Sequence, residues 1–114
     1  GKSPFIVFAD SDIQSAVNAQ VAAIFAASGQ SCVAGSRLLI EASVKDEFLA
    51  RLVERVSRIR VGLPNDMATE YGPLCTERQL RNIEAVVERS VKQGAKVLAG
   101  GKALDRGGFY YAPT

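Results

Sequence analysis

The sequence contains no histidine, and this absence limits how a cysteine in it could act as a nucleophile. Without an imidazole base in the chain, a helix N-terminus, a lysine or a group from elsewhere would have to activate the thiol. Only two cysteines are present, Cys32 and Cys75, which is too few for a disulfide scaffold. A reducing compartment is therefore favoured, and we expect a cytoplasmic protein. No cysteine or carboxylate cluster has the spacing of metal ligands, so we expect no metal site.

An excess of charge of one sign is also missing. The 14 basic and 12 acidic residues give a net charge of +2, which provides no electrostatic footprint for nucleic acid or for an anionic membrane. No apolar run approaches the roughly 18 residues of a membrane span. We therefore expect neither kind of partner. The pairs Gly100-Gly101 and Gly107-Gly108 do not form the Gly-x-Gly-x-x-Gly fingerprint, so the chain does not encode a dinucleotide phosphate loop.

The length and composition are those of one globular domain. With 114 residues, of which 47% are hydrophobic, the chain can bury a real core but is too short for two domains. It begins without a methionine, and it stops just after an apolar run at 109–112 that is typical of a strand. We therefore expect residues 1–114 to be a single partial domain of a longer protein.

Strand and helix patterns alternate along the chain. The apolar run 5–9 predicts a strand buried on both faces, and strands are also predicted at 37–42, 96–99 and 109–112. Apolar residues at helical spacing predict three helices between these runs. Each helix is expected to begin at a capping box and the first and third to end at a glycine: Ser11 with Gln14 and an end at Gly29, Ser43 with Asp46, and Thr76 with Gln79 and an end at Gly94. This order predicts an α/β fold with a largely parallel sheet and flanking helices.

One cysteine stands at the junction between the first helix and the second strand, in Gly29-Gln30-Ser31-Cys32-Val33-Ala34. A free cysteine is often just a small buried hydrophobe, but the small side chains around Cys32 leave space for a substrate. A turn there could also aim the Cys32 N–H at a developing oxyanion. The pattern favours covalent catalysis by a thiolate. No motif flanks Cys75, and we interpret that cysteine as structural.

The residues around Cys32 also carry a family resemblance. Phe25, three residues, Gly29-Gln30, one residue, Cys32, one residue and Ala34-Gly35-Ser36-Arg37 together resemble the active-site cysteine signature of the aldehyde dehydrogenase superfamily. Three later landmarks follow in the family's order: Val61-Gly62-Leu63-Pro64, Tyr71-Gly72-Pro73-Leu74, and the segment 100–114. The resemblance implies part of an aldehyde dehydrogenase-like catalytic domain, without the cofactor-binding domain.

The same resemblance implies a reaction and its residues. Cys32 would attack a small-molecule aldehyde to give a thiohemiacetal, hydride would pass to NAD or NADP, and the thioester would be hydrolysed or taken by CoA. The Cys32 N–H would form half of the oxyanion hole. Ser31 and Val33 would line the substrate pocket, and Gln79 would lie near the cofactor's nicotinamide-side ribose. Asn82 stands where family members often have a lysine.

The general-base glutamate, the asparagine of the oxyanion hole and the cofactor domain of this family lie outside these 114 residues. We therefore expect the isolated segment to be inactive, and the full-length protein to be a homo-oligomer. Two alternatives stay open at this point. One is a self-contained thiol redox or acyl-transfer enzyme, activated by Lys2 or a helix dipole. The other is a non-catalytic α/β interaction module with an inert Cys32.

Overall fold

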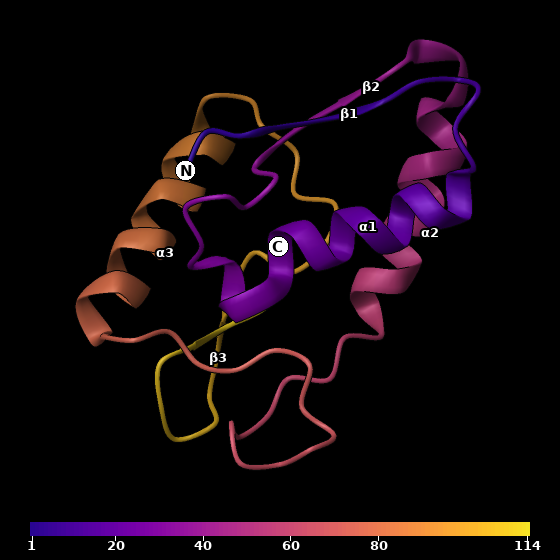
Figure 1. Cartoon of the computed structure of the whole chain (residues 1–114). Coiled ribbons are helices and arrows are strands. Elements are labelled where there is room, and N and C mark those ends of the chain that lie inside the picture. Colours follow the sequence, from indigo (N-terminus) through magenta and orange to yellow (C-terminus); the bar gives the residue numbers. More distant parts are fainter. The chain divides into compact units, whose positions relative to one another are not determined.

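The computed structural model describes all 114 residues (Figure 1). The chain divides into two compact units. The first unit is Gly1–Arg58 and the second is Ile59–Thr114. That residues 1–114 form a single partial domain stays a prediction. None of the helices has both the length and the apolar character needed to cross a membrane.

The first unit is a strand–helix–strand arrangement followed by a second helix. Strand β1 (Pro4–Val7) pairs in parallel with β2 (Arg37–Ile40), and the register runs from Pro4 opposite Arg37 to Val7 opposite Ile40. Helix α1 (Ile13–Phe25) connects the two strands, and α2 (Lys45–Ser57) follows β2. Figure 1 shows the two strands running side by side. The predicted α/β class is confirmed, with one parallel strand pair flanked by helices.

The core of the first unit lies where β1, α1 and α2 meet. Val7, Val17 and Phe48 are its fully buried side chains, one from each of these elements. The other side of the strands is open, since Ile6 and Phe8 expose 57% and 61% of their surface. The prediction that the run 5–9 is buried on both faces is therefore wrong. Burial alternates along the strand because helices pack against only one side of the pair.

The helices of this unit begin differently from the prediction. The Asp12 carboxylate, not Ser11, caps α1 by accepting a hydrogen bond from the Ser15 N–H at 2.7 Å. Hydrogen bonds from the Ser15 side chain and from the Ser15 N–H hold the pKa of Asp12 below its ordinary value. At α2, a 3₁₀ turn over Ala42–Val44 precedes the helix, which moves the cap position from Ser43 to Val44. The Ser43 hydroxyl therefore caps nothing and instead lies 3.3 Å from a Glu41 carboxylate oxygen.

The second unit contains one long helix and a short hairpin. Helix α3 (Glu77–Lys92) is followed by β3 (Ala103–Leu104) and β4 (Tyr110–Tyr111), which pair antiparallel. As predicted, Thr76 caps α3 by accepting the Gln79 N–H at 3.2 Å. The helix also stops before Gly94, whose φ of 100° suits glycine alone.

Two strand predictions in the second unit need correction. The run 96–99 is not a strand: it pairs with no other segment, and Val97 and Leu98 are exposed. An apolar run without a hydrogen-bonding partner has no reason to stay extended as a strand. The last predicted strand, 109–112, is shorter than expected and covers only Tyr110–Tyr111.

Exposed ion pairs run along helices α2 and α3. Each joins a glutamate to a basic residue one turn later, at distances from 2.5 to 2.7 Å. The pairs are Glu47–Arg51 and Glu54–Arg58 in α2, and Glu77–Arg81 and Glu88–Lys92 in α3. Glutamate preceding the cation by four residues is the favourable orientation on a helix.

Candidate active site

Cys32 lies on an exposed turn in the connection between α1 and β2. The Ala34 N–H donates to the Ser31 carbonyl at 3.3 Å and closes the turn, and the Val33 N–H lies 3.4 Å from the Ser31 hydroxyl oxygen. Neither cysteine of the chain is in a disulfide. The turn brings together Ser31, Cys32 and Val33, three of the four residues predicted for the site, and Val33 is 77% exposed. A thiol at this position is accessible to a small molecule.

The Cys32 N–H differs from its neighbours on the turn in having no hydrogen-bond acceptor within the chain. The N–H groups of Val33 and Ala34 are both used by the turn itself. An exposed N–H without an internal acceptor can donate to an oxygen of a bound molecule next to the sulfur. The arrangement is therefore compatible with the predicted oxyanion contact, which stays a prediction.

Gly35 anchors the carboxyl side of the turn to α1. Its N–H donates to the Ala23 carbonyl at 3.1 Å, and its own carbonyl accepts a hydrogen bond from the Gln20 amide at 3.0 Å. The Ala23 carbonyl is available because α1 ends at Phe25, so the carbonyls of its last turn have no partner within the helix. Sequence reasoning missed Gln20. A polar residue on the buried face of α1, between Val17 and Val21, was the signal that could have revealed it.

The amino side of the turn follows an unusual stretch of backbone. The prediction that the helix continues to Gly29 is wrong: α1 ends at Phe25, and Ala27, Ser28 and Gly29 have φ values of 51°, 55° and 72°. Left-handed backbone is strained for Ala27 and Ser28 but not for glycine. The Gln30 N–H then donates to the Ala27 carbonyl at 3.0 Å. The Cys32 turn is thus held by hydrogen bonds on both sides.

Gln79, the fourth predicted site residue, belongs to the second unit. It lies in the first turn of α3, where its N–H donates to Thr76 and its side chain is exposed. The second cysteine, Cys75, also lies in this unit, just before α3, and it is exposed like Cys32. Exposure therefore does not distinguish the two cysteines, and the structural interpretation of Cys75 stays a prediction.

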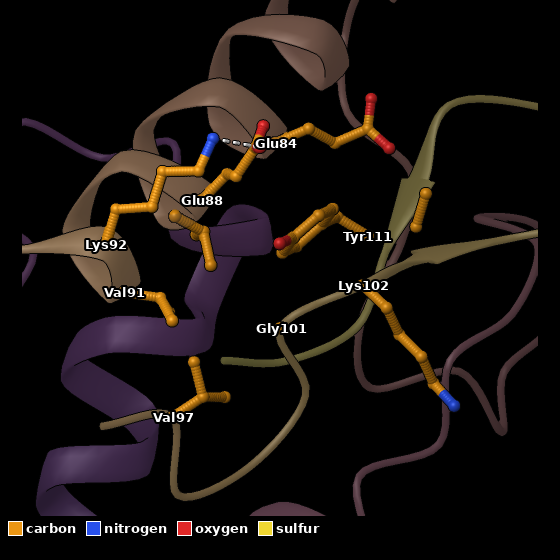
Figure 2. Close-up of a pocket in the computed structure, with 10 residues that line it drawn as sticks. Glu84, Glu88, Val91, Lys92, Val97, Gly101, Lys102 and Tyr111 are labelled. Atoms are coloured by element: carbon orange, nitrogen blue, oxygen red, sulfur yellow. Dashed lines mark hydrogen bonds and ion pairs between the residues drawn. The ribbon is translucent and has the colours of Figure 1, made fainter. Parts of the chain in front are cut away.

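The second unit also contains a groove of about 510 Å³ between α3 and the hairpin region (Figure 2). Val87 and Val91 line it from the helix, and the Tyr111 side chain reaches into it from β4. Burial, with a contribution from the Glu84 carboxylate, raises the pKa of Tyr111 above its ordinary value. No cysteine, serine or threonine lines the groove. In the whole chain, no three cysteine, aspartate or glutamate side chains come together as metal ligands would.

Comparison with known proteins assigns the class. The sequence profile of the Aldehyde dehydrogenase family matches residues 1–114, and the chain belongs to this family. The family predicted from the residues around Cys32 is thereby confirmed. Over all 114 residues, the chain is 70% identical to (Z)-2-((N-methylformamido)methylene)-5-hydroxybutyrolactone dehydrogenase of Acinetobacter baylyi. It is 40% identical to the cytosolic 10-formyltetrahydrofolate dehydrogenase of Mus musculus, again over the whole chain.

Solved structures show the same backbone. PnpE from Pseudomonas sp. WBC-3 superposes on 99% of the chain with a TM-score of 0.95 and 43% identity. A betaine aldehyde dehydrogenase variant from Staphylococcus aureus, in complex with NAD+ and with a BME-modified cysteine, has a TM-score of 0.96 and 36% identity over 99% of the chain. The chain spans only part of these proteins: 23% of the Acinetobacter protein, 13% of the mouse protein, and 24% of each structure.

Proposed function

We propose that this chain is the nucleophile-bearing segment of an NAD(P)-dependent aldehyde dehydrogenase, and that Cys32 is the nucleophile. The observation that carries this proposal is the Cys32 turn. In a chain that matches the family over its whole length, it presents an exposed thiol beside an N–H with no internal acceptor. A relative with a BME-modified cysteine supports the view that members of this family contain a reactive thiol.

In the proposed reaction, the Cys32 thiolate attacks the aldehyde carbon and forms a carbon–sulfur bond. The carbonyl electron pair moves to the oxygen, and the Cys32 N–H stabilises this oxygen by donating a hydrogen bond. Loss of hydride from the resulting thiohemiacetal leaves a thioester on Cys32. Water then cleaves the carbon–sulfur bond, which gives the carboxylic acid and restores the thiol. Transfer of the acyl group to CoA is the alternative exit.

A nicotinamide cofactor, when bound, supplies the hydride acceptor for this reaction. The chain itself offers one fitting group, the exposed Gln79 amide, whose side chain makes no hydrogen bond within the chain and can pair with a ribose hydroxyl. Other cofactor contacts would come from parts of the protein outside these residues. Structures of relatives in complex with NAD+ support the use of a nicotinamide cofactor. We propose in addition a cytoplasmic homo-oligomer.

The proposed substrate is a small-molecule aldehyde that contacts Ser31 and Val33. The name of the Acinetobacter relative specifies a 5-hydroxybutyrolactone. Such a lactone is the ring-closed form of a 4-oxo acid, and therefore exposes an aldehyde when the ring opens. The 70% identity of this segment supports a substrate of that functional class. The exposed Val33 side chain offers an apolar contact next to the nucleophile.

The decisive experiment is Cys32→Ser in the complete enzyme, with Cys75→Ser as the matched control because both cysteines are exposed. We expect Cys32→Ser to lower the rate of aldehyde-dependent NAD(P) reduction by at least about a thousandfold, as removal of a covalent nucleophile does. Cys75→Ser should leave it within about twofold. A Cys32→Ser enzyme that retains more than a tenth of the wild-type rate would disprove the proposal.

A further inference from the structure

Gln20 is the buried polar side chain of α1, and it is only 4% exposed. Its two helix neighbours on the buried face, Val17 and Val21, are apolar. The amide nitrogen donates to the Gly35 carbonyl at 3.0 Å, while the amide oxygen has no partner within the chain. Burying a polar amide costs free energy, and here the bond to Gly35 is the contact that offsets this cost.

The backbone at Gly35 lies unusually close to α1. A Cβ atom at this position would lie 3.3 Å from the Gln20 amide oxygen and 3.3 Å from the Phe5 Cβ. Both hydrogen-bonding groups of Gly35 also point to the helix, because its N–H binds the Ala23 carbonyl. Contacts on both polar groups fix this residue in position and in orientation.

Gly35 adjoins the turn that carries the thiol. The turn closes between Ser31 and Ala34, Ala34 is buried, and Gly35 follows directly. From Arg37 onward the backbone is held by β2, beginning with the bond from the Arg37 N–H to the Ser3 carbonyl. Between the turn and the strand, the hydrogen bonds of Gly35 are therefore the attachment to α1.

We propose that Gln20 is a positioning residue for the nucleophile: its amide fixes Gly35 and thereby sets the place of the Cys32 thiol and N–H. This inference rests on the proposed function of Cys32. Gln20 itself contacts no substrate. The side chain has to be a donor, since the Gly35 carbonyl can only accept. A side chain of the same length without a donor would leave Gly35 attached to α1 by the Ala23 bond alone.

The test compares Gln20→Met and Gln20→Leu in the complete enzyme with Val21→Ala as the control. Methionine and leucine are close to glutamine in size but have no group that can donate to the Gly35 carbonyl. Val21→Ala removes buried volume from the same face of α1 and leaves the Gln20 bond in place. Thermal melting of each variant establishes that it is folded.

For both Gln20 variants we expect kcat to fall by about tenfold or more, because small displacements of a reacting group are costly. The KM for the nicotinamide cofactor should change by less than about twofold. Amide hydrogen exchange at Ala34 and Gly35 should become at least about tenfold faster. Val21→Ala should lower the melting temperature while kcat and the exchange of these amides stay at wild-type values.

Each result has one meaning. If Cys32→Ser is inactive but both Gln20 variants keep wild-type kcat and exchange rates, the positioning role is wrong and the proposed function stands. If Cys32→Ser remains active, the proposed function is wrong, and Gln20 positions no nucleophile. If Val21→Ala loses kcat as strongly as the Gln20 variants, the effect is one of general packing, which also overturns the inference.

Discussion

Ala27 and Ser28 are the two residues of the chain, other than glycines, that have positive φ angles. The left-handed conformation costs an L-residue roughly 1–2 kcal/mol, because its Cβ crowds the following carbonyl. Both residues lie between the end of α1 and the Cys32 turn, where the chain reverses over a few residues. The strain is therefore located directly before the proposed nucleophile, as is common near functional sites.

Replacing Ala27 with glycine should relieve this strain. We expect Ala27→Gly to raise the free energy of unfolding by about 0.5–1 kcal/mol, the relief being partly offset by the greater freedom of glycine in the unfolded chain. Ala19→Gly is the matched control, since Ala19 is exposed in the middle of α1 and should lose about 1 kcal/mol. Urea unfolding followed by circular dichroism measures both. The same sign for the two substitutions would show that Ala27 is not strained in solution.

At the residue scale, the sequence predicted the Cys32 turn but neither the left-handed residues before it nor the hydrogen bond that joins it to α1. The order of Gly29, Cys32 and the small residues after it was enough to place an exposed thiol between a helix and a strand. The left-handed Ala27 and Ser28 could not be foreseen, because neither residue type favours that conformation. The Gln20 bond depends on a tertiary contact between residues 15 positions apart, which local pattern does not specify.

At the scale of elements, two helix starts that look alike in the sequence behave differently. Ser43 and Thr76 each precede an acidic or amide residue by three positions, and both were predicted as caps. Only Thr76 accepts a backbone N–H of its helix. Ser43 fails because the 3₁₀ turn over Ala42–Val44 shifts the start of α2. Helix boundaries depend on such one-residue shifts and are hard to predict for that reason.

Because only Thr76 caps its helix, we expect that removing the side-chain hydroxyl group destabilises the protein more at Thr76 than at Ser43. Thr76→Ala should reduce the free energy of unfolding by about 1 kcal/mol, because the Gln79 N–H loses its capping oxygen. Ser43→Ala should change it by less than about 0.5 kcal/mol, as for an ordinary exposed side chain. Equilibrium urea unfolding of the two variants provides the comparison. Equal losses would mean that Ser43 caps α2 after all.

The predicted helices were found because their apolar residues recur every three to four positions over several turns, a signal that tertiary context rarely overrides. The predicted strands were less accurate because a short apolar run does not specify its partner. The run 37–42 finds β1 and forms β2, whereas the run 96–99 finds no partner and stays irregular. The run 109–112 did not specify its partner either: its central residues form β4, which pairs antiparallel with β3 and not in the expected parallel arrangement.

At the scale of the whole molecule, the chain contains the proposed nucleophile but spans about a quarter of its relatives' length. We predict that the 114-residue chain alone is alkylated by iodoacetamide faster at Cys32 than at Cys75, and that it reduces no NAD(P) when supplied with aldehydes. Peptide mass spectrometry and absorbance of the reduced cofactor measure the two properties.

The alternatives to the proposed function give other results in the same assays. A self-contained thiol enzyme would turn over a substrate without any further part of the protein. A non-catalytic module would show no preference for Cys32, and Cys32→Ser would leave the complete protein unaffected. Turnover by the isolated chain, or equal alkylation of both cysteines in the complete protein, would therefore contradict the dehydrogenase assignment.

The ion pairs along α2 and α3 have a consequence for how the chain folds. All four link residues within one helical turn, so they can form before any distant segments meet. Helix α3 has no buried residue, and its two local ion pairs and its Thr76 cap each favour the helical state. Local contacts of this kind form on the microsecond timescale, whereas joining β1 to β2 requires closure of a loop of about thirty residues. Helix formation in α3 should thus precede assembly of the parallel strand pair, and with it the completion of the Cys32 turn.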